Sequence, residues 1–502
     1  AGTYYYQCGN HAGMIGTITV SATTTIDLSE GNLITFNQTA NTTVSFANTS
    51  NGYVYIIRKK DISDTARTIT WPTGIGWSGG SEPTLDTDGK SVDIIKLVTR
   101  DEGVTWDARL VYNDNASALT AYVWGGNNDG VQGRNMDEGS WPGYNGQLSS
   151  PTQIASLWKD VSTNKRLAEY AGGVRNDGTL WTWGSNDKGK LGLNQSSPTK
   201  LSSPTQVGTE STWSEIHPGD KHALGLKNDG TLWSMGGNQK GQLGLNNTAQ
   251  YSSPTQIPGT WSGSNIVSGS YFSAAVKSDN TLWVWGRNYE GQLGQNQAGA
   301  QLDSLSSPTQ IPGTTWSYCT KPEYQFALAT KTDGTLWAWG HNTAWAMGIN
   351  QPTTTYRSSP VQIPGTWATG RQQICGAEKS SAGIKADGTL WTWGMNQEGQ
   401  LGQNTPVNTY QSSPVQVGTD TDWLKVDIGG YGPSGQATLA LKTDGTLWAW
   451  GTNAVDTNGI VGQLGQNVPN QANQHRSSPV QIGTQTNWTK ISAAGTQIAL
   501  TS

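Results

Sequence analysis

The chain has 502 residues, of which 13% are charged, a formal net charge of −5, and 64 Gly and 24 Trp beside only 4 Phe. This composition excludes a disordered chain, which would lack the aromatic residues, and it favours many short strands joined by Gly-rich turns over a helical fold. The sequence has no basic block and no apolar run of about 18 residues, so we expect neither nucleic acid as a partner nor insertion into a membrane.

Residues 1–20 contain a predicted strand and a short loop that carries Cys8, His11 and Met14. The segment resembles the last hairpin of a cupredoxin, in which a Cys, a His and a Met on one loop bind copper, and these ligand types suit that metal. The resemblance also implies a second His from an earlier strand, and the sequence holds nothing upstream. We therefore expect a hairpin remnant with an incomplete copper-like set, and neither a bound metal nor a cofactor. Because an initiator Met is missing, we expect the chain to be the C-terminal part of a longer or processed protein.

Residues 21–113 contain short alternating stretches separated by Gly, Asn and Asp, which predict a separate β-sandwich or jelly-roll domain. These stretches are residues 32–36, 43–46, 53–57, 68–71, 92–98 and 105–112. The order Ile69-Thr-Trp-Pro, Trp77-Ser-Gly-Gly and Gly103-Val-Thr-Trp106 resembles a module of bacteriophage tail-fibre and other virion proteins. That resemblance implies a virion as the biological context.

Residues 114–502 carry one repeat seven times, with the core Asp-Gly-Thr-Leu-Trp-x-Trp-Gly. Met235 replaces the second Trp of one copy, Asn280 replaces the Gly of another, and a degenerate copy reads Tyr122-Val123-Trp124-Gly125. The six full copies are residues 177–184, 229–236, 279–286, 333–340, 387–394 and 444–451. Self-similarity at a fixed period of this length indicates a propeller or another repeat architecture.

Three more segments follow each core: Gly-Gln-Leu-Gly-x-Asn, then Ser-Ser-Pro-x-Gln-Ile/Val, then a lone Trp with a short strand of small residues. Asp-Gly predicts a tight hairpin turn that needs φ > 0. Leu-Trp-x-Trp places both indoles on the same face of a strand, because side chains alternate along a strand. One four-stranded unit cannot bury two such rings alone, so we expect the units to pack around an axis.

The two ends of this region complement each other. The last repeat ends with the small-residue strand at residues 496–501, and the first repeat lacks such a strand. We expect the C-terminal strand to complete the first blade, which closes the ring and removes its sheet edges. The predicted fold is therefore all-β: a seven-bladed β-propeller (114–502) with terminal strand closure, preceded by a small β-sandwich or jelly-roll domain (21–113) and the hairpin (1–20).

The repeated motifs resemble the regulator of chromosome condensation family of seven-bladed propellers. The family's namesake binds nucleosomes and acts as a nucleotide-exchange factor for a small GTPase, and secreted bacterial relatives bind and inhibit proteins through the propeller face. The resemblance implies the fold and not the function. This chain lacks the basic surface expected for the first role, and no exchange wedge is evident for the second.

Candidate chemistry is sparse. No His pair has metal-ligand spacing, and we expect His217 in a loop and His222 in a blade strand. The Asp-Gly pairs are better explained as turns than as catalytic acids, and the repeat gives most Trp residues a packing role. The aromatic residues of the long blade insertions are the ligand-binding candidates, with self-packed loops as the alternative; they are Trp141, Tyr144, Tyr251, Tyr289, Trp345 and Tyr410.

These features predict a non-enzymatic virion appendage protein, that is, a phage fibre, spike or decoration component. Its propeller would recognise a host-surface glycan or protein, its other partners would be virion proteins, and its location would be the virion, outside the cell. Two alternatives remain open at this point. The first is a bacterial adhesin, secreted or at the cell surface. The second is a polysaccharide-degrading enzyme, which would need two converging carboxylates.

Overall fold

The computed structural model divides the chain into two compact units, Ala1–Ala118 and Leu119–Ser502. Each unit is considered by itself. The structure describes residues 17–20, 23–27, 33–38, 42–47, 52–60, 69–77, 92–99 and 104–113 of the first unit. In the second unit it describes residues 119–134, 148–164, 169–195, 200–261, 265–298, 302–320, 325–405, 407–430, 436–453, 462–467 and 475–501. Cys8, His11 and Met14 lie outside these ranges.

The first unit contains a six-stranded and a three-stranded sheet. Its strands are β1 (Thr17–Val20), β2 (Thr23–Asp27), β3 (Leu33–Gln38), β4 (Thr42–Ala47), β5 (Gly52–Lys60), β6 (Ile69–Thr70), β7 (Ile75–Trp77), β8 (Val92–Thr99) and β9 (Trp106–Asn113). Each predicted alternating stretch coincides with one of these strands. Strands β1, β3 and β5 pair in parallel, as do β2, β4 and β6, whereas β5, β8 and β9 pair antiparallel. Side chains alternate along a strand whether its neighbour runs parallel or antiparallel. The sequence pattern therefore could not predict this parallel pairing.

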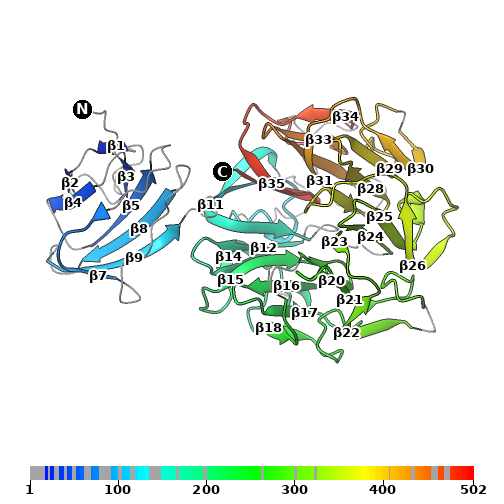
Figure 1. Ribbon diagram of the computed structural model, residues 1–502, viewed down its shortest axis with the longest axis horizontal. Helices are drawn as coiled ribbons and strands as arrows, with labels where there is room; N and C mark the ends of the chain where they lie inside the picture. The colour runs from blue at the N-terminus through cyan, green and yellow to red at the C-terminus, as the bar shows by residue number, and fades with distance from the viewer. Residues whose placement is uncertain are drawn as a thin grey trace. The chain divides into compact units, whose positions relative to one another are not determined.

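The second unit is a propeller (Figure 1). We number its blades in chain order, beginning with the blade that starts in β11, so that the blade formed by both ends of this unit is blade 7. Blade 1 holds the end of β11 (Leu148–Thr163), β12 (Tyr170–Arg175), β13 (Leu180–Ser185) and β14 (Lys200–Gln206). Blade 2 holds β15 (Trp213–Pro218), β16 (His222–Lys227), β17 (Leu232–Gly236) and β18 (Tyr251–Ile257). Blade 3 holds β19 (Asn265–Ser268), β20 (Phe272–Val276), β21 (Leu282–Arg287) and β22 (Ser304–Ile311). Blade 4 holds β23 (Trp316–Cys319), β24 (Phe326–Lys331), β25 (Leu336–His341) and β26 (Tyr356–Ile363).

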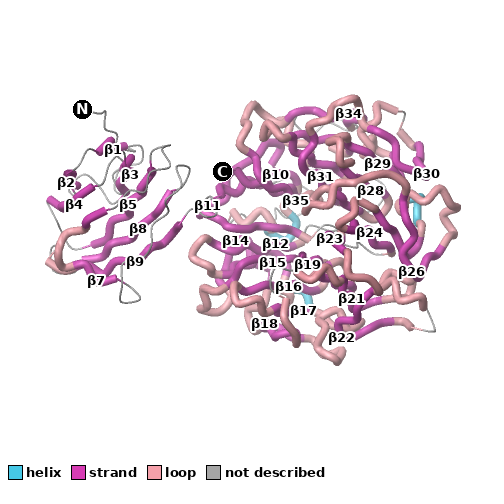
Figure 2. Tube along the Cα trace, in the orientation of Figure 1, coloured by secondary structure: helices cyan, strands magenta, loops and turns pink. Residues whose placement is uncertain are grey.

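Blades 5 and 6 repeat the same order of four antiparallel strands. Blade 5 holds β27 (Ile374–Gly376), β28 (Ser380–Ile384), β29 (Leu390–Asn396) and β30 (Thr409–Gln416). Blade 6 holds β31 (Trp423–Gly429), β32 (Ala437–Lys442), β33 (Leu447–Gly451) and β34 (Arg476–Gln481). Blade 7 holds β35 (Trp488–Ser492), β36 (Thr496–Thr501), β10 (Leu119–Gly125) and the start of β11. Three short 3-10 helices, η2 (Asn128–Gly130), η3 (Asp187–Gly189) and η5 (Thr343–Trp345), lie in the connections (Figure 2).

The ring closes as predicted from the two ends of the repeat region. The C-terminal strand β36 pairs with β35 on one side and with β10 on the other, in a register that runs from Thr120↔Thr501 to Gly125↔Thr496. All six residues of β36 are buried. The predicted fold class, a seven-bladed propeller with terminal strand closure, is therefore confirmed.

The motifs shared by the repeats hold neighbouring blades together. Except in blade 2, where Met235 replaces it, the second indole of the core donates its Nε1 proton to a backbone carbonyl of the preceding blade, as Trp183 does to Val131 (2.7 Å) and Trp339 to Gln292 (2.8 Å). The indole of Trp124 donates to the carbonyl of Gln463 (2.9 Å), and this bond joins blade 6 to blade 7. Each of these indoles is fully buried, and because an unpaired buried N–H costs free energy, the bonds fix how adjacent blades pack.

The Gly-Gln-Leu-Gly-x-Asn and Ser-Ser-Pro segments are partners across the blade boundary. The Asn backbone N–H donates to the carbonyl of the first Ser of the next blade, as from Asn246 to Ser306 (2.8 Å) and from Asn467 to Ser149 (2.7 Å). The Asn residues adopt positive φ, 57° at Asn246, a conformation that Asn tolerates better than most residues. The Pro that follows lies in the outermost strand of its blade, where a missing ladder donor is tolerated.

Candidate functional site

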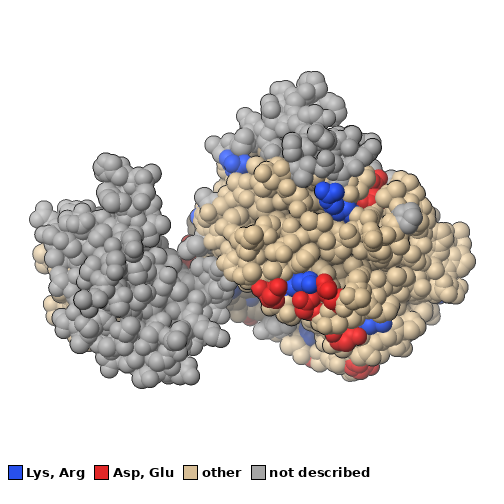
Figure 3. All heavy atoms as spheres, turned by 90° about the horizontal axis from the view of Figure 1, so that it is seen from above, with Lys and Arg blue, Asp and Glu red and all other residues tan. Residues whose placement is uncertain are grey.

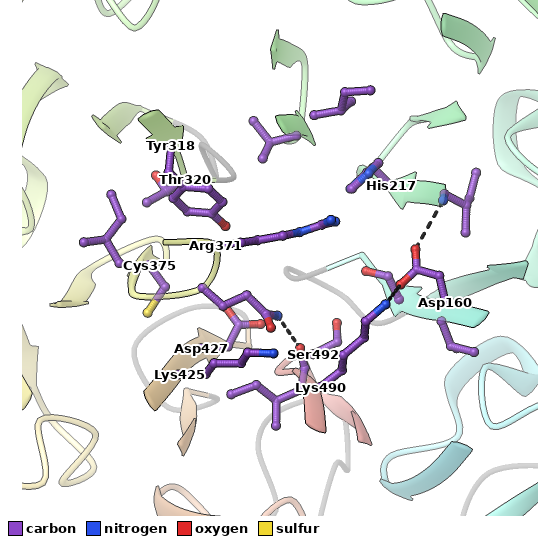
Figure 4. A pocket seen from close by; sticks show the side chains of 18 residues that line it. Asp160, His217, Tyr318, Thr320, Arg371, Cys375, Lys425, Asp427, Lys490 and Ser492 are labelled. Atoms are coloured by element: carbon purple, nitrogen blue, oxygen red, sulfur yellow. Dashed lines mark hydrogen bonds and ion pairs between the residues drawn. The ribbon is translucent and has the colours of Figure 1, made fainter. Parts of the chain in front are cut away.

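A small cavity lies on the propeller axis, where the innermost strands of all seven blades meet (Figure 4). Its volume is about 100 Å³. The lone Trp of each repeat lies at or shortly before the start of the innermost strand, or within β11 in blade 1, and the residue two positions later faces the axis in several blades. These axial positions are not repeated in kind: blades 1 and 4 carry Asp160 and Tyr318 there, and blades 6 and 7 carry Lys425 and Lys490.

Arg371 reaches across this cavity from the connection that precedes β27 of blade 5 (Figure 4). Its guanidinium pairs with Glu215 Oε1 of blade 2 at 2.9 Å, and His217 Nε2 donates to Glu215 Oε2 at 2.9 Å. Burial lowers the pKa of His217, so this imidazole is neutral at pH 7. Burial works against ionisation of Glu215, but the hydrogen bond from His217 and the charge of Arg371 outweigh it, and the pKa of Glu215 lies well below its usual value. The ion pair therefore links blades 2 and 5, which are not neighbours, across the axis.

The two axial lysines have different partners. Lys490 Nζ lies 3.5 Å from Asp160 Oδ1 of blade 1 and donates to the carbonyl of Lys159 (3.1 Å). Lys425 Nζ donates to the carbonyl of Thr489 (2.6 Å), and among the described residues no carboxylate lies within ion-pair distance of it. Burial, followed by the charges of Lys490 and Arg371, lowers the pKa of Lys425 to about 8.

The cavity is small for a substrate. Ligand pockets for small molecules span roughly 300–1,000 Å³, and this cavity is several times smaller. Within the part of the chain that the structure describes, no group of three or more His, Cys, Asp and Glu side chains could hold a metal ion. In the same residues, no helix has the length and apolar character needed to cross a membrane.

The Asp residues of the repeat are turn residues. In each full copy the Asp carboxylate accepts hydrogen bonds from the backbone N–H and the hydroxyl of the Thr two positions later, as Asp333 does from Thr335 (3.0 and 2.7 Å). The Thr hydroxyl in turn accepts the Nε1 proton of the first Trp, here Trp337 (2.8 Å). The bonds from Thr335 lower the pKa of Asp333, and a general acid would need the opposite shift. The prediction that the Asp-Gly pairs form turns is confirmed.

Four exposed apolar side chains and one half-buried Trp lie over blades 3 to 5, and we call this set the aromatic rim. Its members are Tyr289, Trp345, Tyr356, Val407 and Tyr410. Each lies in the connection to the outermost strand of its blade or at the start of that strand, so all five share one end of their blades. Tyr289, Tyr356, Tyr410 and Val407 are 56%, 53%, 48% and 45% exposed.

Contacts between neighbouring blades join blades 3 to 5 at the aromatic rim. The ring of Trp345 in blade 4 lies 5.0 Å from that of Tyr410 in blade 5. The backbone N–H of Asn296 in blade 3 donates to the carbonyl of Ser358 (2.6 Å), two residues after Tyr356. Tyr356 itself is stacked on His341, with ring centroids 4.2 Å apart. On the face seen in Figure 3, charged side chains are few and basic ones lie beside acidic ones.

The structure brings together three of the six predicted ligand-binding residues, Tyr289, Trp345 and Tyr410, in this rim. Tyr251 lies in β18 of blade 2, where it is half-buried and its hydroxyl accepts a bond from Asn247 (3.3 Å). Trp141 and Tyr144 lie outside the described residues. Sequence reasoning missed Tyr356 and Val407, although Tyr356 precedes its Ser-Ser-Pro by the same two residues as Tyr410. It also placed His217 in a loop, but this residue lies in β15 and lines the axial cavity.

The chain thus forms a closed seven-bladed propeller, in which the residues of the repeat make the contacts between neighbouring blades. The sequence profile of the RCC1-like domain matches residues 113–433, and the chain belongs to this family. The matched region begins at residue 113, so the resemblances of residues 1–20 and 21–113 to other families stay predictions.

Relatives of this chain include eukaryotic proteins with different roles. The chain is 28% identical over 350 residues to the ultraviolet-B receptor UVR8 of Arabidopsis thaliana, and the matched region covers 69% of this chain and 64% of that protein. It is 26% identical over 316 residues to the E3 ubiquitin-protein ligase HERC2 of Homo sapiens, covering 61% of this chain and 5% of that protein. It is 28% identical to the mitochondrial RCC1 domain-containing protein RUG3 of Arabidopsis thaliana, covering 57% of this chain and 64% of that protein. The chain thus spans less than two thirds of the length of these relatives.

Two solved structures share the fold. Human WBSCR16 has a TM-score of 0.62 at 18% identity, covering 77% of this chain and 99% of that chain. Yeast RCC1 (Prp20), solved bound to Kap60, has a TM-score of 0.60 at 17% identity, covering 76% of this chain and 89% of that chain. At this identity the likeness shows the fold alone.

These relatives contradict the predicted function. The relatives are eukaryotic RCC1-like proteins, a receptor and a ubiquitin ligase among them, and they point to regulatory or cellular roles and not to a virion appendage. The predicted phage context, the location in a virion or outside a cell, and the partners, virion proteins and host glycans, are wrong for the same reason. Those predictions depended on a pattern within residues 69–106, where Gly and Asp residues between short apolar stretches favour β structure and leave the biological source open.

Proposed function

We propose that the propeller is a protein-interaction module without catalytic activity, and that the aromatic rim contacts the partner. The observation that carries this proposal is the rim itself: Tyr289, Tyr356 and Tyr410 are about half exposed on three successive blades. Single apolar side chains on a surface are normal, but a contiguous exposed patch marks an interaction site. Protein interfaces are enriched in Tyr, Trp and Arg, and such residues dominate binding free energies.

The axis argues against an enzyme. The ion pair of Arg371 and Glu215 spans a cavity of about 100 Å³, so a substrate would have little room there. The acids that the repeat places in every full copy are engaged by Thr hydroxyls. Hydrogen bonds from Thr lower the pKa values of Asp229, Asp279, Asp333, Asp387 and Asp444, which suits a turn better than acid catalysis. A propeller of this family bound to another protein is known in the yeast RCC1 structure with Kap60, which supports the same type of role.

Site-specific photo-crosslinking in the cells that produce the protein tests this proposal. A benzophenone amino acid at position 289, in the rim, is compared with the same group at position 424, where Leu424 is 38% exposed on blade 6. We expect a discrete crosslinked partner from position 289 and none from position 424. Partner recovery by the double variant Tyr356→Ser/Tyr410→Ser should fall about 10-fold or more, since hot-spot residues contribute about 2 kcal/mol each. Equal recovery by the double variant and by Leu424→Ser would defeat the proposal.

A further inference from the structure

The axial cavity has a feature that protein binding at the rim does not use. Three cationic side chains line it, Arg371, Lys425 and Lys490, each from a different blade. Arg371 is paired with Glu215 and Lys490 with Asp160. Lys425 is half-buried, and its ammonium group donates to the backbone carbonyl of Thr489. A cation removed from water without a counter-charge is unfavourable, and a bound anion would relieve that cost.

We propose that the axial cavity binds one small oxyanion, of the size of phosphate or sulfate, with Lys425 as its main contact and Arg371 and Lys490 beside it. The room is sufficient, because a cavity needs only roughly 10–15 Å³ in the same measure to hold one water molecule, and this one has about 100 Å³. An ammonium group has three donors, and Lys425 spends one on Thr489. Two donors of Lys425 therefore stay available for oxyanion oxygens, and bonds between charged partners are the strong ones.

The acidic groups of the cavity already have donors of their own. Asp160 accepts from Lys490 (3.5 Å) and from the backbone N–H of Ile216 (3.4 Å). Asp427, on the same strand as Lys425, accepts from the backbone N–H of Ala493 (2.9 Å). Both oxygens of Glu215 are engaged, by Arg371 and by His217. These bonds hold the carboxylates at the walls, and among the described residues that line the cavity none is an acidic partner of Lys425.

The lowered pKa of Lys425, about 8, has the same origin, since burial and the two neighbouring cations disfavour its proton. An oxyanion would reverse that effect and raise the pKa of Lys425. The titratable groups around Lys425 in the cavity are Arg371, Lys490, Asp160, Asp427, His217, Tyr318 and Cys375.

Calorimetric titration of the full chain with inorganic phosphate, at an ionic strength held constant with sodium chloride, tests the proposal. Wild type is compared with Lys425→Gln and with the control Lys188→Gln, which removes the same charge from an exposed side chain on blade 1. We expect phosphate to bind the wild type and the control alike, and Lys425→Gln to bind about 10-fold more weakly or worse, the loss typical of a charge-assisted hydrogen bond. Equal affinity of wild type and Lys425→Gln, or no binding by the wild type, would overturn it.

A second measurement on the wild type is independent of how the variant folds. The lysine Cε resonances of the 13C-labelled chain are titrated with pH, with and without phosphate, and chloride alone is the reference. We expect one resonance with a midpoint near pH 8 that moves upward when phosphate is added. A midpoint that phosphate leaves unchanged contradicts the proposal, whereas failure of the crosslinking at position 289 would leave it standing, because the two sites share no residue.

Discussion

His222 makes the stability of the propeller depend on pH. Its ring is fully buried in β16, and its Nε2 lies 2.7 Å from Ser273 Oγ of blade 3. The Ser273 hydroxyl donates its proton to the carbonyl of Gln242 (2.9 Å), so it accepts from His222 Nε2–H. The other ring nitrogen, Nδ1, is buried and has no hydrogen-bond partner among the residues that the structure describes. Protonation would place an unsatisfied N–H and a charge at Nδ1, and burial accordingly lowers the pKa of His222 to about 3.

The sign follows from the difference between the two states. Below the unfolded pKa of about 6.5, the unfolded chain takes up a proton at His222 and the folded chain does not, so stability falls as the pH falls towards about 3. At about 1.36 kcal/mol for each unit, the loss between pH 7 and about pH 4.5 is about 2.5 kcal/mol from this residue. Burial also lowers the pKa values of His217 and His475, which act in the same direction.

The variant His222→Gln isolates the contribution of this residue. A Gln amide can still donate to Ser273 Oγ but does not titrate, so the free energy of unfolding should fall less on acidification. Urea unfolding of both proteins at pH 7 and about pH 4.5 gives the double difference, in which the effects of other His residues cancel. We expect a value of about 2.5 kcal/mol. If both proteins lost the same free energy of unfolding between the two pH values, the argument from the bare Nδ1 would be refuted.

Two further pairs of variants test the turns and the ring closure. Gly445→Ala places a Cβ at φ +78°, where it overlaps the carbonyl of Thr486, whereas Gly483→Ala places one at φ +61° in open space. We expect urea unfolding to show a loss of about 1–2 kcal/mol for Gly483→Ala from the left-handed conformation alone, and about 1–3 kcal/mol more for Gly445→Ala. Leu500→Ala, in the buried C-terminal strand, should cost about 2–5 kcal/mol, and Leu424→Ala at the surface less than about 0.5 kcal/mol. Equal costs for the two Leu variants would mean that the terminal strand does not seal the ring.

The propeller could be predicted from the sequence because each repeated motif has a partner in the next blade. The indole of Trp183 needs a carbonyl acceptor, and the Gly-Gln-Leu-Gly turns supply the corresponding carbonyls along the chain. Asn246 and Ser306 form such a pair as well. The first repeat lacks a small-residue strand and the last repeat ends with one, so the sequence predicted that the C-terminal strand completes the first blade and closes the ring. The parallel pairing in the first unit could not be predicted, because it depends on contacts between segments that no repeat identifies.

The candidate sites could be predicted from the sequence only in part, because most of their residues occupy positions that the repeat does not conserve. The axial position two residues after the lone Trp holds Asp160, Tyr318 or Lys425 depending on the blade, so no motif marks it. Arg371 lies in an irregular connection, and its reach to Glu215 across the axis depends on the closed ring. The aromatic rim was easier to predict from the sequence, since Tyr289, Trp345 and Tyr410 are aromatic residues in otherwise polar insertions.

The contrast between repeated and unrepeated positions separates stability from recognition in this propeller. A position that carries the same residue in every blade meets the same partner seven times, so its role is packing, as for the buried indoles. A residue that differs between blades does not take part in the repeated packing, so it can have a role in its own blade alone. The Arg371–Glu215 pair occurs at such positions, and so does Lys425, which has no acidic partner among the described residues. Tyr356 and Tyr410 are a further case, since only blades 4 and 5 carry a Tyr two positions before Ser-Ser-Pro. A symmetric ring can therefore present one asymmetric surface and one asymmetric axis, and those two places are where a specific ligand can distinguish one blade from another.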